Sequence, residues 1–283
     1  MTLVWAPGYN GITDPDAQTY IAAVEAADGQ AIEGNVAYAV NDFVVGCKLD
    51  GIWDAIKASC ILAGARTLSG ALVPLKGTAP ANTNFVSADY NRETGLKSDG
   101  TKALDSNRNN NVEPQNNRHL SVWVSESATA SAFGGDIGLY TGAGSGNSYI
   151  GRSNALYNLG SSSPLVTGGT SAVTGFRGIT RTLSTSFNYR AASSTSTIAS
   201  TSVTPASGNI EVFRGGSGLN SNARLSFYSI GESIDLEQLD TRTTRLMNLI
   251  SYSLASGLPD LSTMDIDAAL YIGAGYRAGG TLS

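Results

Sequence analysis

The sequence has little of several residue types on which metal sites and acid–base catalysis depend. Among its 283 residues there are one histidine and two cysteines, and only 14% of residues are charged. Two cysteines, Cys47 and Cys60, are too few for a disulfide framework and argue against a zinc site, so we expect two small buried thiols. The scarcity of such ligands leads us to expect neither a metal nor another cofactor.

Long apolar runs and an excess of basic residues are also missing. No stretch approaches the ~20 apolar residues of a membrane helix. The opening residues, MTLVWAPGYNG, lack the basic region and apolar core of a signal peptide. Lysine and arginine total 18 against 23 acidic residues, a net charge of −5, and no basic stripe is present to neutralise phosphates. We therefore expect synthesis in a cytoplasm, no membrane insertion and no nucleic-acid partner.

Glycine, serine, threonine and asparagine are plentiful, and they separate many short strand-like runs. A chain of this length with 41% apolar residues can bury a large core, about 75% of its extended surface. Short runs divided by such turns predict a mainly β protein, a two-sheet antiparallel sandwich. The Ser/Thr-rich stretch 189–208 is interpreted as containing an exposed edge strand rather than as disordered. The predicted strands cover 119–125, 136–142, 147–153, 175–182, 186–193, 208–215 and 223–231.

The first 60 residues are predicted to be mainly helical. Asp14 before Pro15 combines an N-cap with proline at the first helical position, and Gly29 suits a C-cap. Asp50 is expected to cap a short third helix over 52–56. The apolar positions at helical spacing in the first two helices are Ala17, Tyr20, Ile21, Val24 and Ala27, followed by Val36, Val40, Phe43 and Val44.

A long helix is predicted after the last strand, over 236–254, because apolar residues recur there on one face and Gly257 and Pro259 follow. The sequence thus divides into three parts. Residues 1–60 form a helical N-terminal segment, 61–257 form the sandwich including this helix, and 258–283 form a tail with a short helix near 264–271.

Three acids, Glu232, Asp235 and Glu237, crowd the start of that helix and raise the question of a catalytic carboxylate cluster. Acids that act together from one strand need alternate positions, because side chains i and i+2 share a face. Glu232 and Asp235 are three residues apart and break this pattern. Asp235 with Gln238 resembles a capping pair, and Glu237 suits the first helical turn. The spacing therefore favours a role of these acids in capping the helix N-terminus over a role in a glycosidase site.

Other candidate chemistry is sparse. His119, the lone histidine, has Ser121 nearby, but the surrounding RHLSVWV is a strand pattern without a nucleophile elbow, so we expect a hydrogen-bonded strand-end histidine. The loop 106–117 offers only Glu113, with Asp105 just before it, as carboxylates for calcium. It is interpreted as a polar surface loop, whose amides, Asn109 and Asn110 among them, are candidates for binding sugar hydroxyls.

Three aromatic residues on predicted strands, Trp123, Tyr140 and Tyr149, are the remaining candidates for a glycan site. Each ring could stack on a sugar. Large aromatics on a sheet more often pack between the sheet and whatever covers it, so core burial is the favoured alternative.

Two segments of the sequence resemble a known fold family. GLKSDGTKALDSNRNNN (95–111), followed by RHLSVWVSE (118–126), resembles the opening strands of concanavalin A-like, laminin-G-like jelly rolls, and 222–250 resembles their closing strand with a helix added. The run 50–100 is similar to segments of tailed-bacteriophage virion proteins, tail-fibre or capsid-associated. The resemblance implies a jelly roll on the virion exterior, a homo-oligomer with a trimer as one possibility, and other virion proteins as partners.

We therefore expect a non-enzymatic phage structural protein, a tail fibre or capsid decoration, that exposes a sandwich and binds host-surface glycans. The alternative is a jelly-roll polysaccharide hydrolase or lyase acting on host glycans. It requires two carboxyls about 5 to 9.5 Å apart in a cleft, for which Glu232, Asp235 and Glu93 are the candidates. A third hypothesis is a cellular lectin.

Overall fold

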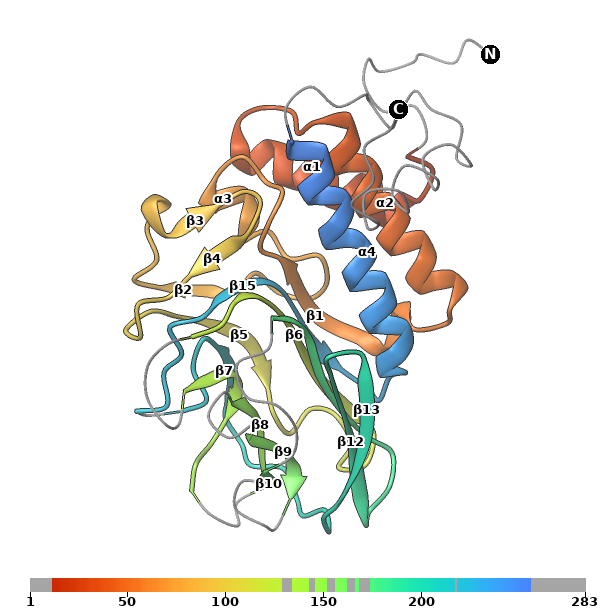
Figure 1. The fold of residues 1–283 in the computed structure, drawn as a ribbon, viewed down its shortest axis with the longest axis vertical. Coiled ribbons are helices and arrows are strands. Elements are labelled where there is room, and N and C mark those ends of the chain that lie inside the picture. The colour runs from red at the N-terminus through yellow and green to blue at the C-terminus, as the bar shows by residue number, and fades with distance from the viewer. Residues whose placement is uncertain are drawn as a thin grey trace, which may run out of the picture.

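The computed structural model describes residues 12–128, 134–142, 146–151, 156–161, 166–167, 174–216 and 218–255. It is a mainly β protein in which two antiparallel sheets face each other, and helices cover the outer side of one sheet (Figure 1). The predicted fold class, a two-sheet sandwich with an N-terminal helical segment and a helix after the last strand, is confirmed.

Sheet A, the eight-stranded sheet, lies next to the helices. Its strands run in the order β13-β12-β11-β6-β15-β4-β3, and β1 also pairs with β15. The segment β6 to β11 to β12 to β13 forms a regular antiparallel series that ends at β13, so the Ser/Thr-rich stretch does supply the predicted edge strand. The bounds are β1 Ile56–Ile61, β3 Tyr90–Asn91, β4 Gly95–Lys97, β6 Arg118–Glu126, β11 Gly175–Arg181, β12 Ser186–Ala191, β13 Ser194–Ala199 and β15 Arg224–Gly231.

Sheet B, the seven-stranded sheet, forms the far layer in the order β10-β9-β8-β7-β14-β5-β2. Every pairing within it is antiparallel. Its strands are β2 Ala81–Thr83, β5 Ala103–Asn109, β7 Gly135–Leu139, β8 Asn147–Gly151, β9 Leu156–Ser161, β10 Val166–Thr167 and β14 Asn209–Val212.

The helices begin where the sequence predicts. The Asp14 side chain accepts from the backbone N–H groups of Asp16 and Ala17 at the start of α1 (Pro15–Asp28), and Gly29 ends it with φ of 69°. Asp235 likewise accepts from Glu237 and Gln238 at the start of α4 (Leu236–Leu254). The other helices are α2 (Gly34–Leu49), the single-turn α3 (Leu68–Ala71), and the 3₁₀ turns η1 (Trp53–Ala55) and η2 (Ser87–Asp89).

The predicted third helix over 52–56 is wrong. Asp50 ends α2 instead of starting a helix, and only the 3₁₀ turn η1 follows before β1 begins at Ile56. The sequence of residues 56–61 is compatible with a helix or a strand. These residues form a strand because they pair with β15, some 170 positions away in the sequence. The C-terminal turn residues Gly257 and Pro259 and the predicted helix at 264–271 lie outside the described residues.

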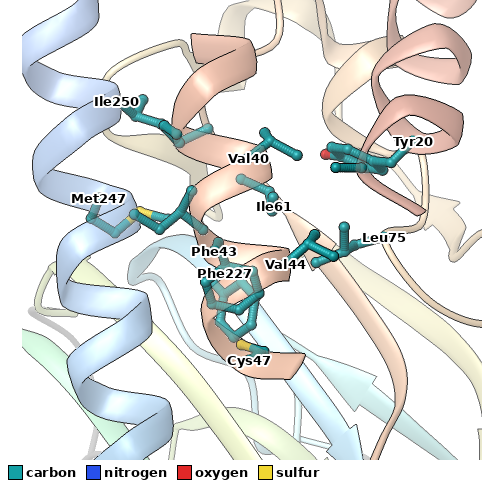
Figure 2. Packing of buried hydrophobic residues seen from close by; sticks show 14 of the residues in the cluster. Tyr20, Val40, Phe43, Val44, Cys47, Ile61, Leu75, Phe227, Met247 and Ile250 are labelled. Carbon is teal, nitrogen blue, oxygen red and sulfur yellow. The ribbon is translucent and has the colours of Figure 1, made fainter. Parts of the chain in front are cut away.

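Two apolar clusters hold the layers together. The first lies between the helices and the outer face of sheet A, where Phe43 of α2 meets Phe227 of β15 edge-on, with 5.6 Å between ring centroids. Figure 2 shows these rings between Met247 of α4 and Val44 of α2, with Cys47 below them. The helices thus pack against β15 through Phe227 and against β1 through Ile61, and these contacts hold the helical layer on the sandwich.

The second cluster fills the space between the two sheets. On β6, Leu120, Val122 and Val124 belong to it, whereas Trp123 packs into the helix-side cluster. This alternation is the period-two pattern of a strand buried on both faces. Sheet A is therefore a central layer, with the helices packed on one face and sheet B on the other.

Candidate functional site

A polar pocket of about 410 Å³ opens where the helical layer meets η1. This volume lies in the range of small-molecule sites. Three separate chain segments supply its walls, the start of α1, residues 48–54 and the segment at Lys76, so the pocket forms only when they pack together. Its lining residues are Asp16, Lys48, Gly51, Trp53, Asp54 and Lys76.

One wall is built by the start of α1 and the end of α2. The side chain of Asn41 accepts from the backbone N–H groups of Thr13 and Asp14, which fixes the N-cap of α1 on α2. Lys48, in the last turn of α2, then pairs with Asp14 at 2.8 Å and Asp16 at 2.7 Å. A lysine there also complements the negative end of the helix dipole.

The indole of Trp53 also lines the pocket. Its Nε1 donates to Asp16 Oδ2 at 3.0 Å, and only 5% of the residue is exposed. The ammonium of Lys76 lies 4.4 Å from the ring centroid and that of Lys48 lies 5.8 Å away, both within cation–π range. The ring is thus held along its edge by a carboxylate and covered on its face by lysine.

The charged groups of the pocket fall into two kinds. Asp16 and Lys48 are committed to each other, and the hydrogen bond from Lys48 holds the pKa of Asp16 below its usual range. Asp54 and Lys76 have no ion-pair partner in the part of the chain that the structure describes. Asp54 is exposed, and Lys76 is half-buried.

This arrangement suits a ligand that carries several hydroxyl groups. The Asp54 carboxylate can accept from hydroxyls and the Lys76 ammonium can donate to them, and Trp53 adds an apolar edge to the same opening. The pocket has equal numbers of acidic and basic side chains, so nothing in it selects strongly for an anion or a cation.

The aromatic residues predicted for a glycan site do not share one surface. Trp123 packs against the helix-side core, and Tyr140 is a half-buried residue after β7. Tyr149 is fully buried, with its ring against Gly135, Gly151 and Gly215. Burial of the ring removes Tyr149 from contact with an external ligand in this conformation.

Asn109 and Asn110 have structural partners. The side chain of Asn109 accepts from the backbone N–H groups of Asn111 and Gly208. Asn110 is fully buried and donates to the carbonyl oxygens of Gly146 and Ala206. A role of these five residues in glycan binding stays a prediction.

The acids considered for catalysis do not converge. Glu232 pairs with Lys57 at 3.1 Å, and Asp235 is the cap of α4. Glu93 lies in the turn before β4, which pairs with the first residues of β15, whereas Glu232 follows the last. Eight residues of strand separate those ends by about 23 Å, well beyond the ~5 to 9.5 Å of a glycosidase pair.

His119 and the cysteines are buried core residues. His119 Nε2 lies 2.7 Å from Ser229 Oγ, its Nδ1 contacts the carbonyl oxygen of Glu232, and desolvation lowers its pKa to about 4. Cys47 and Cys60 are free and buried, as expected. Within the described ranges no group of three or more His, Cys, Asp or Glu side chains could hold a metal. No helix there is long and apolar enough to cross a membrane.

No protein-family model matches the sequence, and a search of curated proteins found no match. Solved structures with a similar arrangement include domain 4 of the extracellular arabinanase AbnA of Geobacillus stearothermophilus, in complex with arabinotriose. It has 9% identity and a TM-score of 0.37 over 59% of this chain and 82% of that one.

Two further similar structures are larger proteins. A mutant Trypanosoma rangeli sialidase that displays trans-sialidase activity has 9% identity and a TM-score of 0.41, over 70% of this chain and 34% of that one. The enzymatically active domain of tailspike protein 2 of bacteriophage CBA120 has 14% identity and a TM-score of 0.33, over 62% and 30%.

These likenesses correct one prediction. The expectation that the protein is not an enzyme is contradicted, because the similar structures are mainly of glycan-processing enzymes. Scores and identities of this size concern the general β architecture and transfer neither a substrate nor an active site to this chain.

Sequence reasoning missed the pocket because its members come from distant segments. Trp53 falls inside the predicted helix over 52–56, and Lys76 follows an apolar, glycine-broken run with no motif around it. The one usable signal is the pair Trp53–Asp54, a large aromatic beside an acid, two residues after a turn glycine, Gly51.

Proposed function

We propose that this protein is a glycan-directed β-sandwich protein of the exterior of a tailed-phage particle, and that the Trp53 pocket receives a sugar of a host-surface polysaccharide. The observation that carries the proposal is that Asp54 and Lys76, which form no ion pair in the described part of the chain, line one pocket together with Trp53, with the Lys76 ammonium over the indole. Hydroxyl-rich ligands need both acceptors and donors beside an apolar surface, and this pocket has all three.

Charge argues for a sugar over a phosphate ligand. The net charge of the chain is −5, and two lysines in the pocket face two aspartates. A phosphate site would need an excess of cations or a backbone cradle. A neutral or weakly acidic saccharide fits this balance better.

Cleavage of the bound glycan is a second candidate function, and the paired carboxyls of the pocket favour it. Asp16 and Asp54 line the same opening. Asp16 stays ionised because Lys48 lowers its pKa, which suits a general base or nucleophile. Asp54 would then be the second carboxyl that such a reaction requires.

The test begins with a glycan array of bacterial capsular polysaccharides and exopolysaccharides, followed by reducing-sugar assays on every polysaccharide that is bound. Lys76→Gln and Asp54→Asn should each weaken binding about tenfold or more, equivalent to ~1.4 kcal/mol. The control is Lys97→Gln in β4, which removes a lysine outside the pocket. Binding that survives both pocket variants would remove the proposal.

Cleavage of the glycan and the location of the protein are tested by separate experiments. Reducing-sugar release that is abolished by Asp54→Asn and Asp16→Asn would establish the second function, and release unaffected by both would exclude these residues. Immunogold labelling of phage particles tests the proposed exterior location, and light scattering of the purified protein tests the expected homo-oligomer.

A further inference from the structure

Sheet A ends at β13, a strand of six residues that pairs with β12 on one side. Among the strands that the structure describes, β13 is the longest with no neighbour on its other side. The remaining sheet edges are short or covered. β3 and β10 have two residues each, β2 has three, and β1 is bonded at Ser59 to the backbone of Lys76. Proteins keep most edges this short because an exposed edge can pair with a further strand.

The turn before β13 fixes how the strand pairs with β12. Ala192 and Ser193 have positive φ angles of 49° and 59°, which is typical of a tight two-residue hairpin turn. Ala191 and Ser194 flank this turn and lie directly opposite each other. Residues in that position form a hydrogen-bonded pair, and such pairs recur at every second residue along an antiparallel ladder.

The backbone groups of the intervening residues point away from β12. The same series of pairs continues past the end of β13, where the N–H of Ser200 donates to the carbonyl of Thr185 at 2.8 Å. The pairs with β12 therefore use the even-numbered residues of β13. The residues whose N–H and C=O groups face outward are Thr195, Thr197 and Ala199.

β13 also lacks the features that usually protect an edge strand. Ser194–Ala199 contains no charged residue and no proline, and its register with β12 has no bulge. Residues 194–197 are exposed. Arg190, which lies opposite Thr195 on β12, is paired with Asp240 at 2.7 Å. A second copy of this uncharged edge can therefore approach it without the repulsion that charged edge residues would cause.

The pattern of outward residues selects one arrangement of two copies. In an antiparallel pair on a twofold axis at Thr197, this residue lies opposite its own copy, and Thr195 lies opposite Ala199 of the partner subunit. All three outward residues are then used, and they exchange about six hydrogen bonds. An axis at Ser196 would place Ala199 opposite the turn and form fewer bonds. The two Thr197 side chains would also lie side by side, a favourable cross-strand pair.

We infer that two copies of the protein associate through antiparallel pairing of their β13 strands, centred on Thr197, so that sheet A continues across a twofold axis. This interface is independent of the Trp53 pocket. A single strand pair buries less than the ~1,600 Å² of a standard interface, so the dimer forms as the protein concentration rises.

The test is sedimentation velocity over a wide range of protein concentration. The wild type should shift from monomer to dimer. Thr197→Lys places like charges opposite each other and should raise the dissociation constant at least about tenfold. Ser251→Lys, a lysine on the exposed side of α4, should associate as the wild type does. Unchanged association of Thr197→Lys would overturn the inference.

A second measurement holds if Thr197→Lys fails to fold. Hydrogen-bonded partners lie about 5.5 Å apart between Cα atoms, which suits a disulfide, so oxidised Thr197→Cys should form a covalent dimer. Thr195→Cys is the matched control and should not, because it faces Ala199 of the partner subunit. The native thiols, Cys47 and Cys60, are buried. A wild type that stays monomeric, or equal crosslinking of the two variants, would contradict the proposed interface.

Discussion

Arg242 of α4 donates two hydrogen bonds to Asp50 at the end of α2, at 2.6 and 2.8 Å, across 192 positions of sequence. One helical turn further, Arg245 forms the same two-pronged contact with Asp42. Both pairs lie at the rim of the helix-side core, where Phe43 and Met247 pack. The last helix is thereby tied to the segment that builds the Trp53 pocket.

Arg242→Ala should lower the free energy of unfolding by about 0.5 to 1 kcal/mol, the range of a partly exposed ion pair. The loss should shrink in 1 M salt, because salt screens the Coulomb attraction. Denaturant titration measures it, with Asn248→Ala on the exposed side of α4 as the control. A loss independent of salt would show that the arginine stem, which packs on Gly46, matters more than its charge.

Asp235→Ala should cost about 1 kcal/mol, the usual value of an N-cap, and should leave glycan binding and any cleavage unchanged. Its carboxylate accepts from two backbone N–H groups, 2.8 and 3.1 Å away, which accounts for its presence without catalysis. Parallel unfolding and reducing-sugar measurements check both halves. Loss of cleavage at unchanged stability would reinstate the acid cluster as a site.

Acidification should destabilise the protein between pH 6.5 and about 4 through His119. The folded pKa is about 4 and the ordinary value is 6.5, so in this window the unfolded chain binds a proton that the folded chain excludes. Stability is therefore full above pH 6.5 and falls with pH, by up to about 3 kcal/mol. Above pH 5 most carboxylates stay ionised, which isolates the histidine.

The measurement is a series of denaturant unfolding titrations from pH 7 to 5 on the wild type and on His119→Gln. The variant should lose the dependence of the free energy of unfolding on pH, whatever its stability at pH 7. An identical slope in both proteins would assign the effect to other groups.

Gly95→Ala should be among the most damaging single-methyl changes in the chain. Gly95 has φ of +89°, and a Cβ would run into the backbone carbonyl of Leu225 on the neighbouring strand. Gly100→Ala is a matched control, since Gly100 has φ of +93° and nothing within 4 Å of the added carbon. We expect about 1 to 2 kcal/mol for Gly100→Ala from backbone strain alone, and a larger loss or no folded protein for Gly95→Ala. Equal losses would refute the clash.

Local chemistry made part of this fold predictable. The caps Asp14 and Asp235 act within three residues, so their sequence patterns suffice for the starts of α1 and α4. The strands β6, β11 and β15 have alternating polar and apolar residues or apolar runs, which indicate a strand without knowledge of the tertiary contacts.

Other elements depend on partners far away in the chain. β1 is a strand because β15 pairs with it, and β3 and β10 have two residues each, too short for any pattern. The pocket poses the same difficulty, since Asp16, Trp53 and Lys76 meet only after three segments have packed. None of the pocket residues was among the sugar-binding candidates predicted from the sequence, because no short-range pattern links them.

The most direct test of the proposed function is a fluorescence titration that reads Trp53 alone. In a protein with Trp5→Phe and Trp123→Phe, addition of the oligosaccharide best bound on the array should change Trp53 emission with the same half-saturation as binding measured by calorimetry. Adding Lys76→Gln should shift that half-saturation at least tenfold higher. Calorimetric binding with no change in Trp53 emission, and no effect of Lys76→Gln, would place the glycan elsewhere and contradict the account.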